Sequence, residues 1–167
     1  MNKILSEYTS LVDKTKPISD EEFEIPLISD TVVSCKPYPI KNHLRDKLKL
    51  HVDDLLATDT IAYTNSTFAS PSFPKLKPNG DIRLLIDYRQ LNANSIKLEY
   101  YFPTIQETFI KIKGKRIFSK IDLERGFYQI SIKKEDRFKT AFTTPFGKFQ
   151  FNRVPFGLTN ARNTSIP

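Results

Sequence analysis

Apolar residues recur at helical spacing in two stretches of the chain. In both stretches they fall every three or four residues, with polar and charged side chains between them, which predicts two amphipathic helices. We expect Asn42 to cap the first helix, and a Thr104/Glu107 capping box and Gly114 to bound the second. The second stripe is expected to pack against the rest of the protein. The stripes are Leu44, Leu48, Val52, Leu55 and Leu56, and Ile105, Phe109 and Ile112.

Two pairs of strand-like runs flank tight turns. Residues 72–77 and 82–88 flank Pro78-Asn79-Gly80-Asp81, and residues 138–144 and 148–151 flank Pro145-Phe146-Gly147. Proline presets φ and glycine readily adopts positive φ, so both turns reverse the chain, and we predict two β-hairpins.

A third alternating run, from Ile117 to Ile121, predicts a buried or half-buried strand that delivers Asp122 at its end. A carboxylate in that place is solvated, paired, or a ligand of a hard metal ion. On a helical turn, Gly126 would leave room above Asp122 for a cation or a substrate. A purely structural role is equally open, because Asp is common where a strand enters a turn.

The remaining segments carry weaker signals. Residues 1–24 show no sustained periodicity, and we expect a loosely ordered arm. Prolines 26, 37 and 39 indicate that residues 25–40 form extended chain lying over a surface. Residues 154–161 form a glycine-containing loop that leads into a candidate helix.

The charge favours a polyanionic partner. The 167 residues include 26 Lys and Arg against 19 Asp and Glu, a formal net charge of +7 with a pI near 9.4. Nucleic acid is one such partner, although many proteins of this charge bind none. The single cysteine, Cys35, excludes an intramolecular disulfide and a cysteine-based zinc site. No apolar run reaches membrane-spanning length, so we expect no membrane contact and a cytoplasmic location, with a virus-like particle or the nucleus as alternatives.

The first hairpin concentrates cations. Lys75 and Lys77 share one face of its first arm, and Arg83 lies just after the turn. Such a group could hold a polyphosphate, with Arg as a bidentate fork and Lys as a point charge. The alternative is a solvated edge strand that Lys protects from aggregation.

Six short motifs follow one another in a fixed order. They are Ser70-Pro71, Pro78-Asn79-Gly80, Asp87 to Asn92, Phe118 to Leu123 with Gly126-Phe127, Lys139 to Phe142, and Pro155 to Ala161. In this order they resemble the reverse transcriptase domain of Pol polyproteins from long-terminal-repeat retrotransposons and, more distantly, retroviruses. The resemblance covers about residues 25–161. It implies an α+β, right-hand polymerase fold, with a fingers-like region over 25–115 and the first part of a palm, with an incomplete sheet, over 116–167.

The resemblance implies an RNA-directed DNA polymerase that adds deoxynucleotides to a primer 3′-hydroxyl by two-metal phosphoryl transfer. Its partners would be an RNA or DNA template with primer, deoxynucleoside triphosphates and the remainder of a Pol polyprotein. Asp122 and the carbonyl of Leu123 would bind Mg²⁺ or Mn²⁺ in a complete enzyme. The nucleotide-binding residues would be Lys75, Lys77, Arg83, Phe127 and Phe156, and the template-binding residues Asp87, Arg89 and Gly157.

Two departures from the family pattern change the expectation. The family's second carboxylate motif, Tyr or Phe, any residue, then Asp-Asp, does not occur in the expected context, and Arg162 stands where proline usually follows Asn-Ala. We therefore expect a truncated or degenerate polymerase, inactive alone, with apolar palm surface exposed. The alternatives are a non-catalytic nucleic-acid-binding module derived from a retroelement and an α+β interaction domain.

Overall fold

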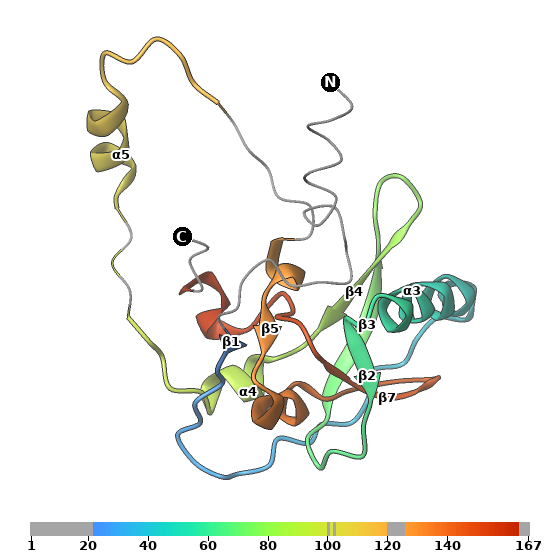
Figure 1. The fold of residues 1–167 in the computed structure, drawn as a ribbon. Coiled ribbons are helices and arrows are strands. Elements are labelled where there is room, and N and C mark those ends of the chain that lie inside the picture. Colours follow the sequence, from blue (N-terminus) through green and yellow to red (C-terminus); the bar gives the residue numbers. More distant parts are fainter. Residues whose placement is uncertain (1–21, 100, 102, 120–125, 164–167) are drawn as a thin grey trace, which may run out of the picture.

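The computed structural model describes residues 22–99, 101, 103–119 and 126–163 (Figure 1). None of the helices in these ranges has the length and apolar content needed to cross a membrane. The helices are α3 (Arg45–Ala57), α4 (Arg89–Ala93) and α5 (Ile105–Ile112), and the 3₁₀ helices are η1 (Asn42–Leu44), η2 (Gly126–Gln129), η3 (Lys134–Thr140) and η4 (Thr159–Asn163). The strands are β1 (Glu22–Phe23), β2 (Ile61–Tyr63), β3 (Ser70–Leu76), β4 (Ile82–Ile86), β5 (Ser131–Ile132), β6 (Phe142–Thr144) and β7 (Gly147–Phe151).

Both predicted hairpins are present, but the first arm of the second is shorter than the predicted 138–144, because residues 138–140 belong to η3 and the strand begins only at Phe142. Strands β3 and β4 pair antiparallel, as do β6 and β7, and the hairpins join through a parallel contact between β3 and β6. The resulting five-stranded sheet has the order β2-β7-β6-β3-β4, which leaves β2 and β4 at its edges. A separate parallel pair joins β1, from the end of the predicted N-terminal arm, to β5.

The first predicted helix is confirmed as α3, which contacts β2 and β4 of the sheet. Its apolar stripe is buried at Leu48, Val52 and Leu55. The expected cap at Asn42 is wrong. Asn42 is the first residue of η1, which leads directly into α3. The N-cap of α3 is Leu44, which makes no side-chain capping hydrogen bond, and its backbone N–H donates to the carbonyl of Lys41. A preceding helical turn thus supplies the geometry that a capping side chain would otherwise provide.

The second predicted helix is confirmed as α5, but the expectation that it packs is wrong for this part of the chain. The capping box is present, since Glu107 N–H donates to Thr104 Oγ1 at 3.2 Å and Thr104 N–H donates to Glu107 Oε2 at 2.7 Å. However, the predicted stripe is exposed, by 75% at Ile105, 63% at Phe109 and 39% at Ile112. Figure 1 shows α5 standing away from the sheet. Local signals therefore fix this helix without any tertiary partner among the described residues.

The prediction of a strand from Ile117 to Ile121, leading to Asp122, is wrong over residues 117–119, the part that the structure describes. Residues 117–119 are irregular, and Ile117 is 91% exposed. Alternating apolar residues form a strand only beside another strand, and none of the described strands pairs with this segment. Residues 120–122 of the prediction lie outside the described residues.

Residues 25–40, here called the strap, follow the predicted extended course over the body. At its start, Ile25 N–H donates to Asp136 Oδ2 at 2.7 Å, while Lys139 Nζ donates to the Ile25 carbonyl at 2.8 Å. Farther along, Cys35 N–H donates to the Ala69 carbonyl at 2.8 Å, beside an isolated bridge between Ser34 and Ala69. Hydrogen bonds thus fix the strap before it reaches Tyr38.

Candidate nucleotide and template site

The hairpin places two of its predicted cations side by side. Lys75 and Arg83 are directly opposite each other in the β3–β4 register, and both are exposed. Directly opposed residues share a face of the sheet, with their Cβ atoms about 5 Å apart. Lys77 is also exposed and lies one residue beyond β3. The arrangement presents a small basic surface to solvent.

Hydrogen bonds hold the turn that joins β3 to β4. Gly80 adopts a φ of 82°, and Asp81 N–H donates to Asn79 Oδ1 at 3.1 Å. Lys47 of α3 reaches across and donates from Nζ to the Gly80 carbonyl at 2.6 Å. Helix α3, whose other face is buried against the sheet, therefore holds the exposed turn, which limits the motion of the cations at the hairpin mouth.

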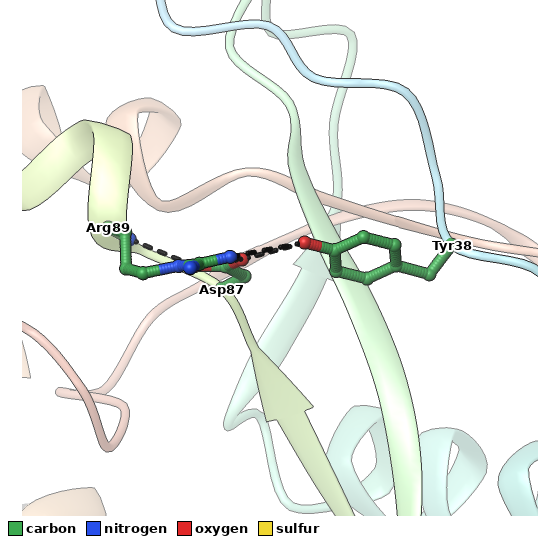
Figure 2. A network of polar contacts seen from close by, with 3 residues as sticks. All are labelled: Tyr38, Asp87 and Arg89. Atoms are coloured by element: carbon green, nitrogen blue, oxygen red, sulfur yellow. Dashed lines mark hydrogen bonds and ion pairs between the residues drawn. The ribbon is translucent and has the colours of Figure 1, made fainter.

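At the other end of β4, Asp87 and Arg89 form an ion pair that Tyr38 of the strap completes (Figure 2). Arg89 Nη2 donates to Asp87 Oδ2 at 2.6 Å, and Nε donates to both carboxylate oxygens at 2.9 and 3.1 Å. The Tyr38 hydroxyl donates to Asp87 Oδ2 at 2.8 Å. Asp87 Oδ1 also accepts the Arg89 backbone N–H at 3.2 Å, at the start of α4.

This network fixes the charges of both groups. The hydrogen bonds from the Arg89 side chain hold the pKa of Asp87 well below its ordinary value, and the Tyr38 hydroxyl adds to this effect against the opposing influence of burial. The same pairing raises the pKa of Arg89. The Asp87 side chain is only 13% exposed, whereas the Arg89 side chain is 83% exposed. The half-buried carboxylate thus serves as an anchor for an exposed cation.

Two hollows flank the network. One, of about 390 Å³, lies on the side of the strap and α4, where Cys35, Lys36 and Gln90 contribute to its wall. The other, of about 500 Å³, lies over the sheet and is lined by Phe73, Leu85 and Ile86. Tyr38, Asp87 and Arg89 line both hollows. The three side chains therefore form the ridge between two open depressions.

The structure brings together two aromatic residues that the sequence placed in one site. Phe127 of η2 and Phe156 meet edge to face, with ring centroids 4.9 Å apart. Tyr128 contacts Phe156 in the same way, at 5.9 Å, and stacks on the buried Phe151 of β7 at 6.1 Å. Phe156 nevertheless remains 54% exposed. The cluster is anchored in the core and presents an aromatic edge to solvent.

The loop that carries Phe156 is held against α4. Asn92 Nδ2 donates to the Gly157 carbonyl at 2.7 Å, and its Oδ1 accepts the Thr159 N–H at 2.9 Å. Gly157 adopts a φ of 99°, and a Cβ there would lie 3.8 Å from the Tyr88 ring. The Tyr88 side chain is buried, and its hydroxyl donates to the Thr140 carbonyl at 2.9 Å. Gly157 therefore lies beside the residue between Asp87 and Arg89.

Strand β4 leads from the hairpin cations to the loop that carries Gly157. The Ile86 carbonyl at the end of β4 would lie 3.9 Å from a Cβ at Gly157, and Arg83 is three residues earlier in β4, roughly 10 Å along the strand. Asp122 and Leu123 lie outside the described residues. Within those residues, no group of three or more His, Cys, Asp or Glu side chains is placed to hold a metal ion.

Two residues that contact the predicted site residues, Tyr38 and Asn92, were not predicted from the sequence to belong to the site. Tyr38 was one of several residues in a proline-containing segment, and its partner Asp87 is 49 residues away. Asn92 belongs to a recognised motif, but its two partners are 65 and 67 residues farther on. One sequence feature did single out Tyr38: the prolines on both sides of it restrict its backbone and so favour a fixed side-chain position.

Comparison with known proteins decides the family. The family model described as "Reverse transcriptase (RNA-dependent DNA polymerase)" matches residues 74–164, more than half of the chain. The chain belongs to the reverse transcriptase family. The sequence is 33% identical over 172 residues to a retrovirus-related Pol polyprotein from transposon opus of Drosophila melanogaster. That match covers 96% of this chain and 17% of the polyprotein, so the reverse transcriptase chain described here spans about a sixth of that relative.

Solved structures agree with the fold. The foamy viral protease-reverse transcriptase dRH in complex with ds DNA superimposes with a TM-score of 0.76 at 23% identity, covering 95% of this chain and 29% of that protein. The foamy viral protease-reverse transcriptase in complex with RNA/DNA hybrid gives 0.70 at 21% identity, covering 96% and 23%. These matches confirm the α+β fold of reverse transcriptase fingers and palm, of which this chain covers a part.

Proposed function

We propose that this chain supplies the fingers and the first part of the palm of an RNA-directed DNA polymerase. In this role it grips an RNA or DNA template paired to a primer, together with an incoming deoxynucleoside triphosphate. One observation carries the proposal: the fold brings together side chains that lie apart in the sequence, Lys75 with Arg83, Phe127 with Phe156, and Tyr38 with the Asp87–Arg89 pair. Support also comes from the foamy viral relatives, which hold ds DNA or RNA/DNA hybrid.

Each group of residues suits one part of the substrate. Lys75, Lys77 and Arg83 form the basic mouth that would contact the triphosphate. The Phe127 ring, backed by Phe156, would exclude a ribose 2′-hydroxyl and so favour deoxynucleotides. Template contacts would come from the network of Asp87 and Arg89 and from Gly157, whose lack of a side chain permits close approach.

Divalent cations would complete the chemistry. We propose that the Asp122 carboxylate and the Leu123 carbonyl supply oxygen ligands, which suit Mg²⁺ or Mn²⁺. Such ions activate a primer hydroxyl and neutralise the charge of a leaving pyrophosphate. Two ions need more carboxylates than Asp122 alone provides. The single Asp-Asp pair of the sequence, Asp53–Asp54, lies in α3, where Asp53 pairs with Lys49.

Binding to a labelled RNA template annealed to a DNA primer tests the proposed function. Fluorescence anisotropy should show binding at low salt that weakens steeply as salt rises, because phosphate contacts release counterions. Arg83→Ala should weaken binding several-fold, whereas Lys111→Ala, an exposed cation on α5, should change it by less than about twofold. Absence of binding by the wild-type chain at 50 mM salt or below would contradict the proposal.

Primer extension tests the catalytic part of the proposal. We expect these 167 residues alone to give no extension with Mg²⁺ or Mn²⁺, because the carboxylates that would join Asp122 are missing from them. Extension that disappears in Asp122→Ala would overturn this expectation. Salt-dependent binding that Asp122→Ala leaves unchanged would favour the alternative of a non-catalytic nucleic-acid-binding module.

A further inference from the structure

We infer that Tyr38 is a positioning residue: through Asp87, its hydroxyl orients the Arg89 guanidinium toward a phosphate of the template strand. The inference deepens the proposed function and rests on it. It assigns a role to the strap, which none of the predicted site residues belongs to, and it specifies the group on the template that Arg89 would recognise.

The Tyr38 hydroxyl arrives at Asp87 already fixed in space. Pro37 and Pro39 restrict the backbone on both sides of Tyr38. Three residues earlier, the backbone hydrogen bond from Cys35 N–H to the Ala69 carbonyl holds the strap. The Tyr38 ring meets Phe73 of β3 edge to face, with centroids 5.8 Å apart and an angle of 74° between the rings. Little conformational freedom is left to lose, so the hydroxyl acts as a preorganised donor.

That donor determines how the Asp87 carboxylate is held. Oδ2 accepts the Tyr38 hydroxyl and Arg89 Nη2, and Oδ1 accepts the Arg89 backbone N–H. Arg89 Nη2 also donates to the Tyr38 hydroxyl, at 3.5 Å. Figure 2 shows the guanidinium lying along the carboxylate, with the Tyr38 hydroxyl at its far end. Removing the hydroxyl would take away the strap's contact with the ion pair. The carboxylate, still bonded to Arg89, would be held less firmly, and the guanidinium would turn more freely with it.

The exposed part of Arg89 is suited to an anion. Its side chain is 83% exposed although Nε and Nη2 bond to Asp87 and Nη2 also donates to the Tyr38 hydroxyl, so much of the guanidinium remains open to solvent. A guanidinium carries five N–H donors, and two of them in a fixed plane match two oxygens of one phosphate. A guanidinium that rotates loses this match, whereas a lysine at the same place would not.

Tyr38→Phe tests the inference because it removes only the hydroxyl. Primer–template binding should weaken about three- to tenfold. In a plot of log K against log salt, the slope should become shallower by about 0.7 to 0.9, the contribution of one phosphate contact. Tyr63→Phe, on an exposed tyrosine of β2, is the matched control and should change neither quantity. Thermal melts of both variants should coincide with wild type within a few degrees, since both hydroxyls are partly or largely exposed.

The background variant Arg89→Ala separates a positioning role from a direct one. If Tyr38 acts through Arg89, adding Tyr38→Phe to Arg89→Ala should cause no further loss of affinity. A further loss equal to that in the wild-type background would overturn the inference, as would wild-type affinity and slope in Tyr38→Phe. If the wild-type chain binds no primer–template at all, the proposed function fails together with the inference. If wild type binds and Tyr38→Phe is indistinguishable from it, the inference alone fails.

Discussion

At the scale of single residues, long-range hydrogen bonds hold the site together, and two of them depend on one side chain. Asn92 bonds to both Gly157 and Thr159 and so ties the loop of Phe156 to α4. An asparagine satisfies both partners because its amide offers a donor and an acceptor in one plane.

Asn92→Ala should lower the free energy of unfolding by about 1–2 kcal/mol, because two backbone groups of the loop lose their partner. Urea denaturation measures this loss. The control is Gln90→Ala, an exposed side chain in the same helix, which should change the free energy by less than about 0.5 kcal/mol. Equal effects of the two substitutions would show that Asn92 does not hold the loop.

The lowered pKa of Asp87 makes part of the stability depend on pH. A carboxylate whose pKa is lower in the folded state stabilises that state above its ordinary pKa of 3.8 and loses this contribution as pH falls. Asp87→Asn should therefore be less stable than wild type at pH 7. The difference should shrink as pH falls from about 5 to 2, because in this range the carboxylate gains a proton in the unfolded chain but stays largely ionised in the folded one. Urea curves at several pH values measure it, and a difference that stays constant would contradict the role given to the Asp87–Arg89 pair.

At the scale of elements, the sequence predicted what local chemistry specifies. The turns at Pro78-Asn79-Gly80 and Pro145-Phe146-Gly147, the periodic stripe of α3 and the capping box of α5 all depend on neighbours a few residues apart, and each element is present. The strand expected at Ile117 is absent over its described part, because a strand depends on a partner strand, which can be far away along the chain. Tertiary partners, including that of Tyr38, could not be derived from one sequence.

The exposed position of α5 gives a prediction about this element. Ile110→Ala should change the free energy of unfolding by less than about 0.5 kcal/mol, because its side chain is largely exposed. Ile61→Ala, the same substitution at a buried position of β2, should cost about 2–5 kcal/mol. Chemical denaturation compares the two. A large loss in Ile110→Ala would mean that α5 packs on the body in solution.

At the scale of the whole molecule, the family and fold could be predicted because six motifs occur in order, and the family match and the foamy viral structures confirm both. Where the structure describes them, several predicted site residues are neighbours: Phe127 with Phe156, Lys75 with Arg83, and Asp87 with Arg89. Their roles in binding nucleotide and template remain predictions. Their selection as site residues comes from the order of the motifs, whereas the strap contact that completes the Asp87–Arg89 pair comes only from the fold.

Hydrogen–deuterium exchange with and without an RNA/DNA primer–template tests the central claim most directly, because it shows which face binds. The account predicts slower exchange at the hairpin turn, residues 77–81, at the start of α4, and in the loop 156–159, with no change in α5. Slower exchange confined to α5 or to the outer face of α3, with the hairpin turn and the loop unchanged, would contradict it.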